Sequence, residues 1–150
     1  IRISYVEVLD LPETRLDELK KSYYFDCDCT RCKDNAERVK MTSMACAKED
    51  CTEFVQPSDE KCKDCNTEVT DAMRNRFEDV IEMTKAMLQE MGETRYIDVC
   101  RNLVKQQRGV LHQKNIWHLK TVDLAFEAAI DFEAWEEAVV YGKDFIEGLR

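Results

Sequence analysis

The residues with the clearest capacity for chemistry are cysteines. Eight of them occur in 150 residues, at positions 27, 29, 32, 46, 51, 62, 65 and 100. Seven lie in two short-spaced sets, C-x-C-x2-C at 27–32 and C-x4-C-x10-C-x2-C at 46–65. Disulfides would imply an oxidising compartment, and the first residues show no secretory leader. Thiolate binding of zinc is therefore the better account of the cysteines.

The second set has the pattern of a closed zinc site. Cys46 and Cys51 form one pair and Cys62 and Cys65 another. Two such pairs supply the four thiolates that tetrahedral Zn²⁺ takes. Four sulfurs leave no position for water or substrate, so this set predicts a structural rather than a catalytic metal site.

The first set, Cys27, Cys29 and Cys32, is one ligand short of a closed site. Cys100 stands between Val99 and Leu103 in an apolar stripe, where a small buried thiol is more typical of a core than of a metal site. A fourth ligand from outside this sequence is thus the simplest explanation, and its identity stays open.

Aromatic residues lead into the first cysteine set. Tyr23, Tyr24 and Phe25 come directly before it, and Tyr5 lies on an alternating segment near the start. The residues by themselves allow these rings either to cover a metal cluster and fill a core or to wall a binding site. His112 and His118 are the only histidines, and both are far in sequence from the cysteines. Surface or packing roles suit them better than metal binding.

Periodicity predicts a mainly α fold with one short strand. Residues 1–9 alternate and favour a strand, and residues 10–23 favour a helix capped by Asp10. Residues 26–70 show little periodicity and are predicted to be loops organised by metal. Four apolar stripes then predict helices around 73–91, 96–104, 115–130 and 135–149, joined by short linkers as antiparallel hairpins.

Charge and hydropathy narrow the function classes. The chain has 31 acidic and 22 basic side chains and a net charge of −9, which argues against binding to a nucleic-acid backbone. No run of about 18 apolar residues predicts a membrane span. An acidic surface suits basic polypeptide partners or solubility alone. The ends of the sequence suggest a piece of a longer chain.

Three segments together resemble a known family. "ISYVEVL", then "KKSYYFDCDCTRC", resembles the end of a SET domain running into its post-SET zinc loop, as in the SET-and-MYND (SMYD) protein lysine methyltransferases. "VDLAFEAAIDFEAWEEAVVYGKDFIEGLR" resembles the first helices of their tetratricopeptide-like domain. The four-cysteine insert occurs in some members only.

The resemblance implies a domain organisation and a function. It divides the chain into the end of a SET domain (1–25), a post-SET zinc loop with its insert (26–70) and the first helices of a tetratricopeptide-like domain (71–150). The parent protein would transfer methyl groups from S-adenosylmethionine to lysines of histones or other proteins, in the cytoplasm, the nucleus or both. The isolated piece would be inactive.

The resemblance also assigns roles to residues. Tyr5 matches a catalytic tyrosine at the base of the lysine channel, and Tyr23 matches an aromatic that walls it. Phe25 matches a residue near the adenine of the cofactor. Cys27, Cys29 and Cys32 match zinc ligands that are completed by a cysteine of the SET core, which lies upstream in the family and is absent here.

An alternative function belongs to a different class. Stacked helical hairpins form concave surfaces, so residues 71–150 also fit a non-enzymatic zinc-binding adaptor that holds a peptide partner in its helix groove. The sequence leaves open the target lysine, the degree of methylation, the activity of the parent and the oligomeric state.

Overall fold

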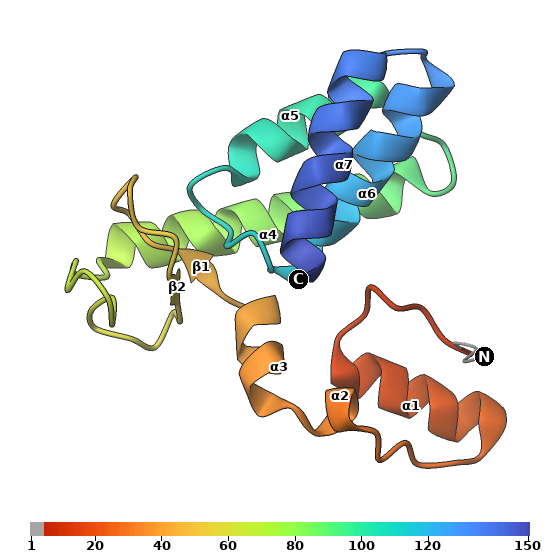
Figure 1. The fold of residues 1–150 in the computed structure, drawn as a ribbon, viewed down its shortest axis with the longest axis horizontal. Helices are drawn as coiled ribbons and strands as arrows, with labels where there is room; N and C mark the ends of the chain where they lie inside the picture. Colours follow the sequence, from red (N-terminus) through yellow and green to blue (C-terminus); the bar gives the residue numbers. More distant parts are fainter. Residues whose placement is uncertain (1–4) are drawn as a thin grey trace.

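The computed structural model of the chain describes residues 5–150 (Figure 1). Helices α1 to α3 make a small N-terminal lobe, and helices α4 to α7 make a larger helical lobe. In the order of the chain, a two-stranded sheet comes between the two lobes. The mainly α fold predicted from periodicity is confirmed. No helix in the described part of the chain is long and apolar enough to span a membrane.

The N-terminal segment differs from its prediction. Residues 1–4 of the predicted strand lie outside the described residues, and residues 5–9 form bends and turns. The strand prediction is wrong for residues 5–9. An alternating segment becomes a strand only when a neighbouring strand completes its hydrogen bonds, and the β pairings described within residues 5–150 join other segments.

Helix α1 (Pro12–Tyr23) confirms the first helix prediction. Pro12 occupies the first turn, where its missing N–H costs nothing. The predicted cap is wrong, because Leu11 takes the cap position and Asp10 forms an ion pair with Lys120 instead. The helix ends where Tyr24 adopts a left-handed conformation with φ of 58°.

The region predicted as loops contains regular structure. It holds helix α2 (Thr30–Lys33), helix α3 (Asn35–Met41) and strands β1 (Met44–Ala45) and β2 (Phe54–Val55). The strands are antiparallel, with Met44 opposite Val55. Helix α3 was missed although it carries a capping signal, since the Asp34 carboxylate accepts hydrogen bonds from the N–H groups of Ala36 at 2.9 Å and Glu37 at 3.1 Å.

The four later helices confirm the periodicity analysis. They are α4 (Asp71–Met91), α5 (Ile97–Gln107), α6 (Ile116–Asp131) and α7 (Trp135–Leu149). The hydroxyl of Thr70 caps α4, and the predicted cap Asn115 accepts from the N–H of Trp117 at 3.0 Å. Helix α6 packs against α7, α5 and α4, so it forms the centre of the helical lobe.

Two apolar cores hold the molecule together. The first lies among α4 to α7 and includes Cys100, Val104, Val122 and Ala125. The second joins the sheet region to the helices through Met44, Val55, Cys62, Val69, Phe77, Val80 and Leu111. The cysteine loops therefore share a core with the helical lobe.

The apolar stripe of α7 is only partly buried. Ala138 is buried, and Gly142 and Phe145 are half-buried. The apolar stripe that predicts this helix also includes four residues that are exposed, namely Trp135, Val139, Ile146 and Leu149. The physical reason is that α7 has α6 on one side, while the helices described in residues 5–150 leave its other side uncovered.

A buried polar network crosses the helical lobe. The amide nitrogen of Gln107 donates to the hydroxyls of Thr84 at 3.0 Å and Thr121 at 2.9 Å. The hydroxyl of Thr121 donates to the carbonyl of Trp117, so it must accept from Gln107. The amide oxygen of Gln107 therefore faces Nδ1 of His118, 2.9 Å away, and Nδ1 carries the proton.

This network predicts a pH-dependent stability. Burial first, then Arg108 and His112, lower the pKa of His118 from 6.5 to about 4. Below pH 6.5 the unfolded chain takes up a proton that the folded chain excludes. The contribution of neutral His118 to the free energy of unfolding is complete above pH 6.5 and is lost progressively as the pH falls towards 4. Between pH 7 and pH 5.5 the free energy of unfolding should fall by about 1 kcal/mol more in the wild type than in His118→Asn.

Urea denaturation at the two pH values measures this difference. The asparagine keeps an N–H for Gln107 but has no proton to gain. An equal loss in both proteins would show that His118 does not contribute to the acid sensitivity.

Candidate zinc centres and aromatic site

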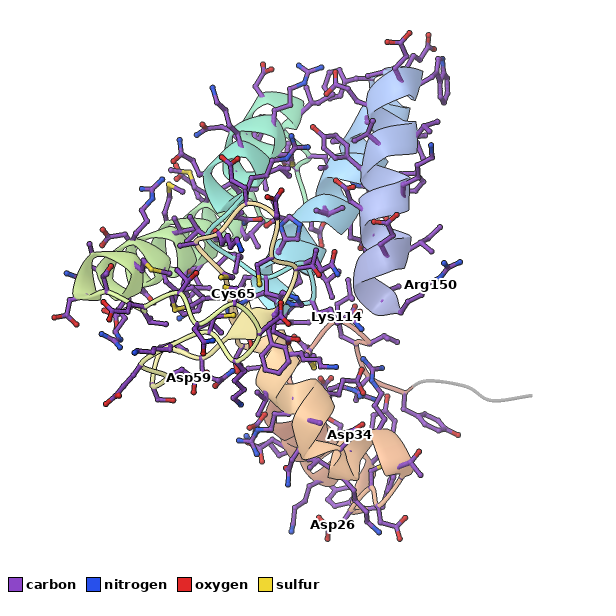
Figure 2. All side chains as sticks on the ribbon, turned by 60° about the vertical axis from the view of Figure 1, so that its left-hand side comes forward. Asp26, Asp34, Asp59, Cys65, Lys114 and Arg150 are labelled. Atoms are coloured by element: carbon purple, nitrogen blue, oxygen red, sulfur yellow. The ribbon has the colours of Figure 1, made fainter. Side chains whose placement is uncertain are left out.

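The four-cysteine set is assembled by the sheet and the turns beside it. Cys46 follows β1, Cys51 lies in the next loop, and Cys62 and Cys65 lie after β2 (Figure 2 labels Cys65). Sγ of Cys46 is 3.4 Å from Sγ of Cys65, and Sγ of Cys51 is 3.8 Å from that of Cys62. All four sulfurs lie within 4.8 Å of one another. That geometry fits four ligands of one Zn²⁺.

Tight turns aim these sulfurs inward. The N–H of Cys62 donates to the carbonyl of Thr67, and the N–H of Asn66 donates to the carbonyl of Cys62. Asn66 adopts a positive φ of 56°, which asparagine tolerates better than most residues. On the other side, the N–H of Cys51 donates to the carbonyl of Lys48 at 3.0 Å. Each pair of cysteines is thus held by its own turn.

Local hydrogen bonds prepare one thiol of this set for a metal. The Thr67 hydroxyl and N–H lower the pKa of Cys65 to about 6, and the hydroxyl lies 3.0 Å from its sulfur. Burial raises the pKa of Cys46. Zinc binds thiolates, so the metal must displace the protons that burial retains.

The three-cysteine set is also brought together. The sulfurs of Cys27, Cys29 and Cys32 lie within 4.8 Å of one another, between α1 and α3. The N–H of Cys32 is the main cause that lowers the pKa of Cys29 to about 7, and burial raises the pKa of Cys32 to about 11. Among residues 5–150, no His, Asp, Glu or other Cys joins the group. Three donors fit a zinc ion that still has one coordination position to fill.

None of the eight cysteines forms a disulfide. Cys100, which the sequence places in a core, is 1% exposed and packs among the helices, and burial raises its pKa. Within residues 5–150, neither histidine joins either cysteine set. Nε2 of His112 donates to the carbonyl of Thr52, and His118 bonds to Gln107.

Tyr23 and Phe25 come shortly before the three-cysteine set in the sequence, and Tyr5 contacts Tyr23. The rings of Tyr5 and Tyr23 are 5.3 Å apart between centroids and inclined at 54°. Tyr5 is 59% exposed, Tyr23 46% and Phe25 43%. Tyr24 is 89% exposed and points away from any core. Tyr5 and Tyr23, which are 18 residues apart, therefore form one exposed aromatic pair, while Phe25 follows at the entry to the cysteines.

A group of buried polar side chains beside the four-cysteine insert was not predicted from the sequence. The Ser43 carbonyl accepts hydrogen bonds from the side-chain amide of Asn115 at 2.9 Å and from the N–H of His112. Gln56 donates to the hydroxyl of Ser43 and to the carbonyl of Val39, both at 2.8 Å. Nothing in a lone serine or glutamine signals such a contact. Asn115 was recognised only as a helix cap.

Comparison with known proteins points to one family. The chain is 28% identical to histone-lysine N-methyltransferase Smyd1 of Mus musculus over 99% of its length, and 28% identical to histone-lysine N-methyltransferase SMYD3 of Homo sapiens over its whole length. It is 26% identical to histone-lysine N-methyltransferase ASHR1 of Arabidopsis thaliana over 94% of its length. No family model matches the chain.

The chain spans 27%, 29% and 32% of the lengths of these three relatives. The resemblance to the SET-and-MYND lysine methyltransferases is confirmed over nearly all of the chain. Relatives that are named as methyltransferases do not favour the adaptor alternative.

The two cysteine sets should differ in how tightly they hold zinc. The purified chain should contain one zinc ion that resists a chelator such as EDTA and a second that is removed readily. Four thiolates enclose the first ion, whereas three leave the second accessible. Atomic absorption before and after dialysis against the chelator measures both. Native far-UV and near-UV spectra in a metal-free sample would contradict a structural role for either ion.

A substitution inside the closed site should unfold the insert. Cys62 is 2% exposed and belongs to the second core, so Cys62→Ser should remove one zinc ion and the folding free energy that the ion supplies. Cys100→Ser is the matched control, because Cys100 is equally buried but is no ligand. The control should keep both ions. Loss of zinc in both variants would mean that general unfolding, not ligation, releases the metal.

Proposed function

We propose that this chain forms part of an S-adenosylmethionine-dependent protein lysine N-methyltransferase. The observation that carries the proposal is the pair of tyrosines, Tyr5 and Tyr23, whose ring centroids are 5.3 Å apart, together with the convergence of the three cysteines that follow Tyr23 in the sequence. The similarity to lysine methyltransferases over nearly the whole chain supports the same reading. Histones and other proteins are the proposed substrates.

The chemistry fits aromatic hydroxyl groups. Transfer to a lysine needs the amine neutral, in line with the methyl group and shielded from water, and it needs little acid or base catalysis. S-adenosylmethionine, when bound, supplies the methyl group on a positively charged sulfur. The hydroxyl of Tyr5 would orient the amine, and the ring of Tyr23 would line its path and stabilise nearby positive charge.

The zinc loop would fix these rings in place. Phe25 stands two residues before Cys27, so a metal bound to Cys27, Cys29 and Cys32 restrains the backbone that carries Phe25 and Tyr23. Phe25 is proposed to pack near the adenine of the cofactor. The domain boundaries proposed here remain 1–25 for the SET end, 26–70 for the zinc region and 71–150 for the tetratricopeptide-like helices.

The chain contains only a small part of such a cofactor site. Phe25 is its single proposed cofactor contact, and the relatives are about three times longer. Isothermal calorimetry with S-adenosylmethionine should therefore show little or no binding to residues 1–150 alone. Micromolar binding to this chain would contradict the assignment of the cofactor site to residues outside it.

In the longer protein, Tyr5→Phe should reduce methyl transfer to a lysine peptide by about tenfold to a thousandfold, because one hydroxyl that orients the amine is lost. The loss should fall mainly on kcat, with KM for the peptide little changed. Tyr24→Phe is the control, since Tyr24 is 89% exposed and has no proposed role. Equal activity of all three proteins would contradict the role of Tyr5.

A further inference from the structure

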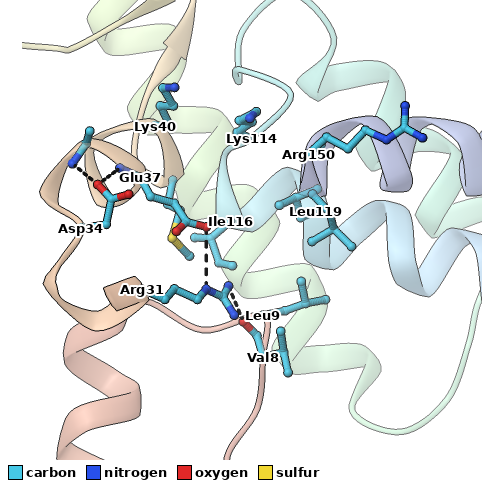
Figure 3. Close-up of a pocket in the computed structure, with 14 residues that line it drawn as sticks. Val8, Leu9, Arg31, Asp34, Glu37, Lys40, Lys114, Ile116, Leu119 and Arg150 are labelled. Atoms are coloured by element: carbon cyan, nitrogen blue, oxygen red, sulfur yellow. Dashed lines mark hydrogen bonds and ion pairs between the residues drawn. The ribbon is translucent and has the colours of Figure 1, made fainter. Parts of the chain in front are cut away.

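A cavity of about 510 Å³ lies where three parts of the chain meet. Its walls come from residues 8–9, from α2 and α3, and from the segment around the start of α6 and the end of α7 (Figure 3). Met41, Ile116 and Leu119 are buried and give it an apolar floor. None of these residues belongs to the cysteine sets or to the tyrosine pair.

The acidic side chains of this cavity are already engaged. The Asp34 carboxylate accepts hydrogen bonds from two N–H groups at the start of α3. The Glu37 carboxylate lies 3.7 Å from Nε of Arg31, and Figure 3 draws this pair across the middle of the cavity. Their negative charges are therefore compensated locally.

Two lysines of the cavity have no such compensation. Lys40 and Lys114 are half-buried and lie on the same side of the cavity in Figure 3. Within residues 5–150 neither ammonium group forms an ion pair, and that of Lys40 lies 5.7 Å from the centroid of the Phe54 ring, which is not part of the cavity lining. Burial lowers the pKa of His112 nearby; the Thr52 carbonyl and the Glu53 carboxylate oppose this shift, and Lys114 and Lys40 add to it. A chain of net charge −9 thus gathers free positive charge at one cavity.

The cavity is close to the aromatic pair. Val8 and Leu9 line it, and Val8 is three residues after Tyr5, so the edge of the cavity at Val8 is at most about 11 Å from Tyr5 along the backbone. Lys40 and Lys114 lie on the opposite side of the cavity from Val8 in Figure 3, and are therefore farther from the tyrosines. Arg31 donates a hydrogen bond to the carbonyl of Val8 at 3.2 Å, which ties this segment to the cavity wall. An extended peptide covers the same distance with about three or four residues.

We propose that this cavity binds an acidic residue next to an apolar residue in a peptide whose lysine reaches the Tyr5–Tyr23 pair. The apolar side chain packs on Met41, Ile116 and Leu119, and the carboxylate lies between Lys40 and Lys114. The inference rests on the proposed function and adds to it a substrate class: lysines with an apolar residue about three or four residues away and an acidic residue beyond it.

Fluorescence anisotropy with labelled peptides tests the proposal. The peptides have one central lysine, a leucine three residues to one side or the other, and an aspartate and a glutamate beyond the leucine. Matched peptides carry asparagine and glutamine in place of the two acidic residues. One of the two acidic peptides should bind the zinc-loaded chain roughly threefold to thirtyfold more tightly than its neutral match at low salt. The net charge of the chain opposes this preference, so a local positive site must cause it.

Charge reversal locates the site. Lys40→Glu/Lys114→Glu should abolish or invert the preference. Lys105→Glu/Lys143→Glu changes the net charge equally at two exposed lysines outside the cavity and should keep it. An equal loss in both double variants, or no preference in the wild type, would overturn the proposal. Zinc content and circular dichroism report folding, and Lys114→Glu alone serves if the double variant does not fold.

Methyl transfer by the longer protein separates this inference from the proposed function. Methylation of all peptides with no acidic preference would overturn the cavity proposal and leave the methyltransferase function standing. Binding with the expected preference but no methylation of any peptide would contradict the proposed function and, with it, the substrate role of the cavity. Preferential methylation of the acidic peptide, lost in Lys40→Glu/Lys114→Glu, would support both.

Discussion

Convergence of four sulfurs in the insert is the constraint on which this structure depends. Strands β1 and β2 have two residues each, too few to hold a sheet by themselves. The segment between Cys46 and Cys65 has few apolar residues, so its loops must be fixed by ligands rather than by a core of their own. Without a metal, four thiols this close together in a partly buried site would resist losing all four protons, because the thiolates repel one another. A zinc ion bound by all four sulfurs would fix both cysteine-bearing turns.

The insert in turn positions the two lobes. Met44 and Val55 belong to the sheet and also to a core shared with α4. The N–H of Ala45 donates to the carbonyl of Val110, and Ser43 accepts from Asn115 at the start of α6. These contacts join the end of α3 to the helical lobe. The cavity lined by Lys40 and Lys114 exists because this joint brings α3 beside α6.

Much of the site was predictable because metal ligation follows local spacing. Short cysteine pairs bring sulfurs together whatever the rest of the fold does, and both sets converge as predicted. Long helices were predictable for a similar reason, since an apolar stripe repeats every few residues. The strand prediction failed at residues 5–9 and the loop prediction failed at α3. A strand needs a neighbouring strand that no local pattern specifies, and the start of α3 is marked by a single capping aspartate.

The sequence by itself determined the two cysteine sets that fit zinc, the helical lobe and the family resemblance, because each is encoded in residues close together along the chain. Tertiary structure alone decided which distant groups meet. It brought Tyr5 to Tyr23, turned the Gln107 amide towards His118, and exposed one face of α7. It also placed Lys40 and Lys114 at one cavity, where neither forms an ion pair within residues 5–150. Such contacts depend on how the lobes pack, and no short-range pattern records them.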